Sequence, residues 1–272
     1  MVYSRNDFLK VFYLSSHGMG GDHWFDWLAK ALNAHQDVLV FLGESVRSKY
    51  LKERSRKERP DIVQYTFYLN DVGSRCYEAV GECFSYRAYQ LEVLSKNGLD
   101  VRWANIVRHP YAWLYFYIKW RTSNMNMPED NISGVDHEWS VTKHEEFAKL
   151  PLKKYRREDV HVWSAYQGMD ILNRMASDLH KGVINIPLED LIYNREKFLD
   201  LVHYLFRNRV KYSEDLLDKI YSMVDTPFRG EEALLTDPQK EYESWPKWKK
   251  DAFEVIVNNN TKKMFESYGY EL

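Results

Sequence analysis

The chain has 272 residues, of which 44% are hydrophobic and 15% aromatic, and its formal net charge at pH 7 is −2. This length suits one large α/β domain or two small ones, and the apolar content can form a sizeable core. The near-neutral balance excludes a general nucleic-acid coat, because there is no global excess of basic residues to neutralise phosphates. Cys76 and Cys83 are too few for a disulfide scaffold and are interpreted as free thiols in a reducing compartment.

The N-terminal sequence MVYSRNDFLKVF lacks the long apolar core of a signal peptide. No apolar stretch reaches the length that spans a bilayer. These features predict a cytoplasmic, soluble protein without a membrane span. No metal site is predicted, since Cys and His do not recur at the paired spacing of metal ligands. The oligomeric state is not readable from the sequence.

The first element along the chain is the most informative. Val11–Leu14 is an apolar run typical of a buried strand, and an amphipathic helix is predicted to begin near Asp22. Residues 15–21 between them form a turn rich in glycine. Amide groups at a helix N-terminus favour anions, and glycine lets the backbone approach a phosphate closely. The segment therefore indicates a phosphate-bearing ligand at Gly18–Trp24.

This turn departs from both standard nucleotide motifs. A Walker motif ends in Gly-Lys followed by Ser or Thr, whereas here Gly21 is followed by Asp22 and His23. The dinucleotide fingerprint G-x-G-x-x-G fits Gly18 and Gly20 but fails at His23. The alternative interpretation is an ordinary strand-to-helix turn with Asp22 as its N-cap.

The rest of the chain alternates strands with helices. Strands are predicted at 38–42, 77–81, 101–107 and 183–186, and helices at 85–96, from Pro110 onward, at 160–180, and over most of the chain after 186. The charged segment 47–59 is interpreted as a solvated helix or loop, and 123–135 as a polar insertion. The alternation predicts an α/β fold of three layers, with a mostly parallel sheet covered by helices on both faces.

Arg108 occupies a second position of chemical interest. It stands just past the strand predicted at 101–107 and before the helix that opens at Pro110. Ligands of parallel sheets bind outside the carboxyl ends of the strands, and arginine suits bidentate phosphate binding. An arginine paired with a carboxylate at the sheet edge is the alternative.

Together the two segments resemble the sulfotransferases that use 3′-phosphoadenosine 5′-phosphosulfate (PAPS). In that family one strand–turn–helix holds the 5′-phosphosulfate, and residues 20–24 (Gly-Gly-Asp-His-Trp) are similar to it. A second, usually Arg-(Asn/Asp/His)-Pro, binds the 3′-phosphate, and Arg108-His109-Pro110 is similar to it. Residues 188–191 (Leu-Glu-Asp-Leu), 228–230 (Phe-Arg-Gly) and 268–270 (Tyr-Gly-Tyr) are similar to later family elements.

The resemblance implies a P-loop-like sulfotransferase fold in a single domain over residues 1–272. It implies sulfuryl transfer from PAPS, with PAP as product, to a small-molecule or protein acceptor that carries a hydroxyl or an amine. The donor-binding residues implied are His17, Gly18, Met19, Gly20, Gly21, Asp22, His23, Trp24, Arg108, Phe116, Arg229 and Gly230. Trp24 stands where the cytosolic members stack a Trp on adenine, although the core face of the first helix is an equal alternative.

Four positions depart from the family pattern. Met19 replaces a Lys or Arg, Asp22 replaces a Thr or Ser, Cys83 replaces a Lys, and Phe116 replaces a hydroxyl. A carboxylate about 4 Å from a phosphate costs about 4 kcal/mol at an effective dielectric constant of about 20. Protonated His17 and His23 would restore positive charge, although each also suits an ordinary turn.

The base of the reaction has two candidates. Glu44 follows the strand predicted at 38–42 and resembles the Gly-Glu element of the protein-tyrosine sulfotransferases. Glu82 is the second candidate, at a position where the family often has Asp or Asn. A surface glutamate at a helix N-terminus is the alternative for Glu44.

Two other functions stay open. One is a binding protein that keeps the fold without catalysis, because Met19, Asp22, Cys83 and Phe116 all weaken the donor site. The other is a kinase-like transferase with a different phosphorylated donor. No element of the sequence identifies the acceptor.

Overall fold

The computed structural model describes residues 9–15, 23–42, 62–73, 75–84, 93–124, 146–153, 159–178, 184–224 and 237–272. The chain divides into two compact units, each built from two stretches of sequence. Unit 1 comprises Met1–Val107 and Leu179–Leu234, and unit 2 comprises Arg108–Asp178 and Leu235–Leu272.

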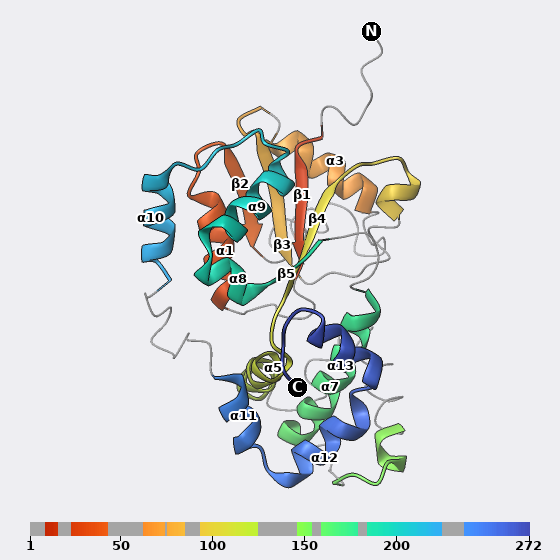
Figure 1. Ribbon diagram of the computed structural model, residues 1–272. Helices are drawn as coiled ribbons and strands as arrows, with labels where there is room; N and C mark the ends of the chain where they lie inside the picture. Colours follow the sequence, from red (N-terminus) through yellow and green to blue (C-terminus); the bar gives the residue numbers. More distant parts are fainter. Residues whose placement is uncertain are drawn as a thin grey trace. The chain divides into compact units, whose positions relative to one another are not determined.

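Unit 1 contains a five-stranded sheet in the order β2-β3-β1-β4-β5, in which every described pair is parallel (Figure 1). The strands are β1 (Val11–Ser15), β2 (Val38–Leu42), β3 (Ala79–Phe84), β4 (Arg102–Val107) and β5 (Ile184–Pro187). Because all five run the same way, their carboxyl ends lie at one edge of the sheet, which we call the carboxyl edge.

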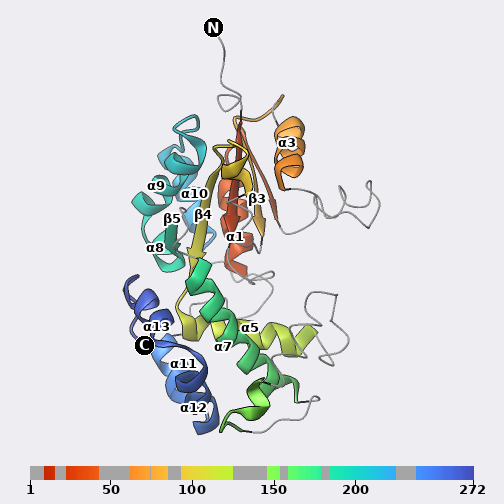
Figure 2. The same ribbon diagram turned by 90° about the vertical axis from the view of Figure 1, so that its right-hand side faces the viewer.

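Helices cover both faces of this sheet, as the sequence predicts. They are α1 (His23–Asn33), α3 (Ile62–Gly73), α8 (Leu188–Tyr193), α9 (Arg195–Phe206) and α10 (Glu214–Ser222). Figure 2 shows α3 on one side of the strands and α8 and α9 on the other. The predicted α/β class with a parallel sheet is therefore confirmed.

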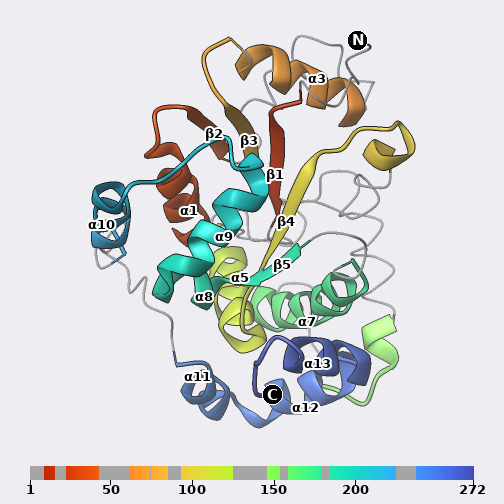
Figure 3. The same cartoon turned by 45° about the horizontal axis from the view of Figure 1, so that its top comes forward.

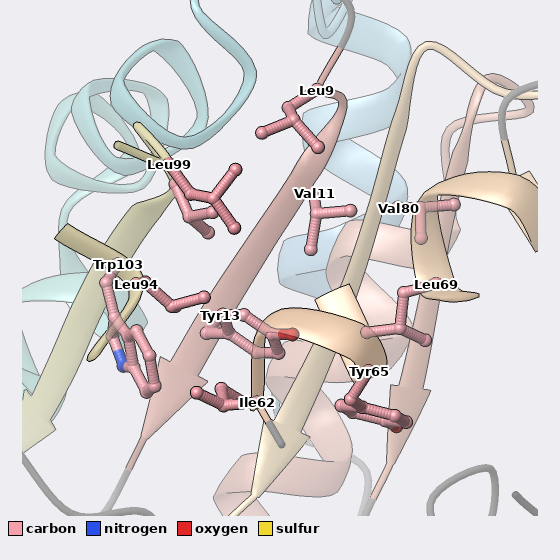
Figure 4. Packing of buried hydrophobic residues seen from close by; sticks show 11 residues of the cluster. Leu9, Val11, Tyr13, Ile62, Tyr65, Leu69, Val80, Leu94, Leu99 and Trp103 are labelled. Atoms are coloured by element: carbon pink, nitrogen blue, oxygen red, sulfur yellow. The ribbon is translucent and has the colours of Figure 1, made fainter. Parts of the chain in front are cut away.

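Side chains of β1 alternate between the two faces, since successive residues of a strand point in opposite directions. Val11 and Tyr13 pack in a cluster with α3. Figure 4 shows that cluster, which comprises Leu9, Val11, Tyr13, Ile62, Tyr65, Leu69, Val80, Leu94, Leu99, Val101 and Trp103. Phe12 packs on the opposite face, with its ring centroid 5.1 Å from that of Phe206 in α9. A Cβ at Gly81 would lie 2.3 Å from the Phe12 ring, so glycine leaves the space that this ring fills.

Unit 2 is helical. Its main helices are α5 (Pro110–Asn124), α7 (Val160–Asp178), α11 (Pro238–Ser244), α12 (Lys247–Ile256) and α13 (Asn259–Glu266), and Figure 3 shows α12 and α13 beside α7. The side chain of Asn173 in α7 fixes the corner between α12 and α13. Its Nδ2 donates to the carbonyl of Ile256, and its Oδ1 accepts from the backbone N–H of Asn258 and from Thr261 Oγ1.

Most predicted elements agree with the structure to within a few residues. The strand predicted at 77–81 is instead β3, Ala79–Phe84, and extends through a charged residue, Glu82. Residues 93–96 of the helix predicted at 85–96 are helical, whereas 85–92, the segment 47–59 and residues 125–135 of the polar insertion lie outside the described residues. Among the described helices, none combines the length and apolar character needed to cross a membrane.

Candidate functional site

The structure describes part of the predicted site. Glu82, Arg108 and Phe116 are described in full, and His23 and Trp24 begin α1, although their side chains lie outside the described residues. The remaining predicted positions, which are His17, Gly18, Met19, Gly20, Gly21, Asp22, Glu44, Arg229 and Gly230, also lie outside them.

The two segments singled out in the sequence follow neighbouring strands. β1 pairs with β4 in parallel, and the register places Ser15 opposite Asn105. The glycine-rich turn continues the chain from Ser15, and Arg108 directly follows Val107, the last residue of β4. In open parallel sheets, ligands bind at this edge, where the chain leaves the strands.

A row of hydrogen-bonded polar side chains crosses β1, β4 and β5 just inside the carboxyl edge. Ser15 Oγ donates to Asn105 Oδ1, and Asn105 Nδ2 donates to Asn185 Oδ1 over 3.0 Å. Trp103 Nε1 lies 3.4 Å from Ser15 Oγ and donates to it. Ser15 and Asn105 are buried, so these bonds replace the water that both side chains lose on folding. We call Ser15, Asn105 and Asn185 the polar row.

Arg108 is almost fully buried, with 1% of its surface exposed. Its Cζ lies 4.2 Å from the ring centroid of Phe116, which is a cation–π distance. The resemblance implies Phe116 as a donor-site residue that replaces a hydroxyl, so its contact with Arg108 is a finding of the structure.

His109 caps the helix that follows Arg108. Its Nδ1 accepts a hydrogen bond of 3.2 Å from the backbone N–H of Tyr111 in the first turn of α5. This leaves the proton on Nε2, which donates over 3.1 Å to the backbone carbonyl of Glu271. Burial, with a smaller effect of the nearby Arg108 charge, lowers the pKa of His109 to about 4, so the ring is neutral at pH 7.

Glu82 lies in the core of unit 1. It is fully buried on β3, and its Oε1 accepts a hydrogen bond of 2.8 Å from Tyr65 Oη of α3. Burial, and secondarily the charge of Glu82, raises the pKa of the neighbouring Cys83 thiol. A general base must come within hydrogen-bond reach of the acceptor hydroxyl. Burial does not separate Glu82 from the other site residues, because Arg108 is buried to the same degree. Glu82 and Glu44 both stay candidates for the base, and the function proposed below uses Glu44.

Unit 2 also holds a buried amine that the sequence does not single out. Lys249 is 5% exposed, with its Nζ 3.9 Å from the ring centroid of Trp245 and 3.6 Å from Glu241 Oε1. Trp245 Nε1 donates to the same carboxylate oxygen over 2.7 Å. Burial lowers the pKa of Lys249 to about 8, against the opposing effect of Glu241. Within the described ranges, no three His, Cys, Asp or Glu side chains gather as metal ligands would.

No protein-family model matches the sequence, and no curated protein matches it. Several solved structures are similar. Mouse sulfotransferase SULT7A1, crystallised with PAP, is 11% identical over 96% of this chain and 88% of its own, with a TM-score of 0.49. The sulfotransferase domain of the Synechococcus PCC 7002 olefin synthase is 16% identical over 96% of this chain and 94% of its own, with a TM-score of 0.45. The sulfotransferase domain from the curacin biosynthetic pathway is 14% identical over 96% of this chain and 98% of its own, with a TM-score of 0.41.

Proposed function

We propose that this chain is a sulfotransferase that moves a sulfuryl group from PAPS to a hydroxyl or amine acceptor, and that residues 1–272 act as one sulfotransferase-like domain in the cytoplasm. One observation carries the proposal. The two segments that resemble the donor-binding elements of that family follow β1 and β4, which are adjacent parallel strands ending at the same edge of the sheet. The strand–turn–helix after β1 and the arginine after β4 have the chemistry that phosphate groups require.

Arg108 is assigned to the 3′-phosphate of the donor. A guanidinium presents a planar fork of N–H donors that matches two phosphate oxygens, and His109 and Pro110 start a helix directly after it. Arg229 and Gly230 are assigned to the same phosphate. The backbone of Gly18–His23 is assigned to the 5′-phosphate, and Trp24 to the adenine.

Glu44 is assigned as the base. When bound, PAPS supplies an activated sulfuryl group. Glu44 accepts the proton of the acceptor hydroxyl as the acceptor oxygen bonds to sulfur and the bond from sulfur to the 5′-phosphate oxygen breaks. Arg108, with His17 and His23 when they are protonated, supplies the positive charge that stabilises the departing nucleotide.

Calorimetric titration with PAP and with AMP, which lacks the 3′-phosphate, tests the donor assignment. We expect the wild type to prefer PAP, and Arg108→Ala to lose at least about 30-fold in PAP affinity, because removal of one partner of a buried charge pair costs about 2–5 kcal/mol. AMP affinity should be unchanged. Arg121→Ala is the matched control, since Arg121 is a buried arginine at the other end of α5. Equal wild-type affinities for PAP and AMP would contradict the assignment.

Turnover separates catalysis from binding alone. Release of PAP from PAPS in the presence of hydroxyl and amine acceptors is expected for the wild type and lost in Glu44→Gln, with PAP affinity retained. Tight PAP binding without release of PAP would identify a binding protein that has lost catalysis. Binding of ATP in preference to PAP would instead identify a kinase-like transferase.

A further inference from the structure

The contact between Arg108 and Phe116 has a consequence for how Arg108 meets an anion. A ring 4.2 Å from Cζ attracts the positive charge and favours one orientation of the guanidinium. The N–H donors of arginine lie at the edge of its plane, so an anion that binds in the plane does not compete with the ring for the face. The ring and a phosphate can therefore contact Arg108 at the same time.

The ring of Phe116 is itself held by its helix. Helix α5 packs on α7, where a Cβ at Gly168 would lie 2.8 Å from Leu114 Cδ2. This packing fixes the rotation of α5 about its axis, and with it the direction in which Phe116 projects. An arginine that is free to change rotamer loses conformational entropy when it binds, whereas one that rests on a fixed ring has lost most of it already.

We propose that Phe116 is a positioning residue that holds the guanidinium of Arg108 in the plane required for bidentate binding of a phosphate. The inference rests on the proposed function, because the phosphate is the 3′-phosphate of the donor. A phenyl ring cannot donate a hydrogen bond, so its contribution runs through Arg108. In the family that this chain resembles, a hydroxyl at this position contacts the 3′-phosphate directly. Here the Phe116 ring contributes to phosphate binding by orienting Arg108.

Three substitutions at Phe116 separate orientation from direct contact. Phe116→Tyr keeps the ring, Phe116→Leu keeps the apolar volume without a π face, and Phe116→Ser installs the hydroxyl that the resemblance implies. Affinities for PAP and AMP are measured by calorimetry for each variant. We expect Phe116→Tyr to bind PAP within about twofold of the wild type, and Phe116→Leu to lose about tenfold. Phe116→Ser should lose at least as much, and AMP affinity should be unchanged throughout.

Tyr117→Leu is the matched control. It removes another ring of the same helix that lies beside an arginine, since Arg121 Cζ is 5.8 Å from the Tyr117 ring centroid. A general loosening of α5 would weaken PAP and AMP alike and would appear in this control. Wild-type PAP affinity in Phe116→Leu, or tighter PAP binding in Phe116→Ser, would overturn the proposal.

A second measurement tests the contact between Arg108 and Phe116 in the absence of a nucleotide. Melting temperatures of Arg108→Met, Phe116→Leu and the double variant form a cycle. If Phe116 holds Arg108, the double variant loses less than the sum of the two single losses. Additive losses would overturn the positioning role, whereas failure of wild-type PAP binding with coupled losses would overturn only the proposed function. Should Phe116→Leu not fold, Phe116→Met takes its place, because methionine fills irregular apolar space.

Discussion

Because burial lowers the pKa of His109, the free energy of unfolding should depend on pH between the ordinary histidine pKa of 6.5 and the lowered value of about 4. Its Nδ1 must stay unprotonated to accept the N–H of Tyr111, and its pKa is lowered to about 4 from an ordinary 6.5. The unfolded chain therefore binds the proton first as the pH falls. Stability from this residue is fully present above pH 6.5, is lost as the pH falls toward 4, and does not change further below that value.

The size of this loss of stability follows from the difference between the two pKa values of His109. At about 1.4 kcal/mol for each pH unit, the free energy of unfolding should fall by about 2 kcal/mol between pH 8 and pH 5 on account of His109 alone. The full interval corresponds to an upper limit of about 3 kcal/mol. His109→Asn is the informative variant, because asparagine also accepts an amide at an N-cap but does not titrate.

Urea unfolding of the wild type and His109→Asn at pH 8, 7, 6 and 5 measures this contribution. Other titrating groups are common to both proteins, so the difference between the two unfolding free energies isolates His109. We expect that difference to shift by about 2 kcal/mol against the wild type on acidification to pH 5. Parallel pH profiles would show that the His109 pKa is not lowered by folding, and the reasoning from its burial and its cap would be refuted.

Three further predictions concern buried polar groups. Tyr65→Phe removes a donor from the Glu82 carboxylate and should lower the free energy of unfolding by about 1–3 kcal/mol in urea, with PAP affinity unchanged because neither residue is assigned to the donor. Lys249→Met should lose about 2 kcal/mol of stability relative to the wild type between pH 7 and pH 10, since the wild-type amine, with its pKa of about 8, becomes neutral in the folded state before it does in the unfolded state. Asn105→Leu interrupts the polar row and should lower the free energy of unfolding by about 1–3 kcal/mol. No destabilisation in Asn105→Leu would show that the row is not maintained in solution.

The sheet is largely predictable because buried parallel strands are encoded as short apolar runs. The sequence predicts β2 with its observed bounds, Val38–Leu42, because its five consecutive apolar residues indicate a buried strand without reference to any other part of the chain. β3 is misplaced because Glu82 interrupts its apolar pattern. A donor to Glu82 is Tyr65, which is 17 residues away on a helix, and the local sequence carries no sign of that pairing.

Residues of the candidate site can be predicted from the sequence only where they belong to a short local motif. Arg108 is recognisable because a proline-initiated helix follows it directly. The hydrogen bond from His109 to Glu271 joins residues 162 positions apart, and no periodicity or spacing encodes such a contact. The pairing of Phe116 with Arg108 likewise depends on the rotation of α5, which its packing against α7 sets rather than its own sequence.

The two units are interleaved along the chain, which passes from one to the other after Val107, Asp178 and Leu234. During synthesis on the ribosome, unit 1 therefore lacks β5 and its following helices until the first half of unit 2 has been made. Unit 2 in turn is completed only by the last stretch of the chain. Neither unit can be produced as one uninterrupted fragment, and a stop codon placed anywhere between the codons for residues 108 and 234 would truncate both.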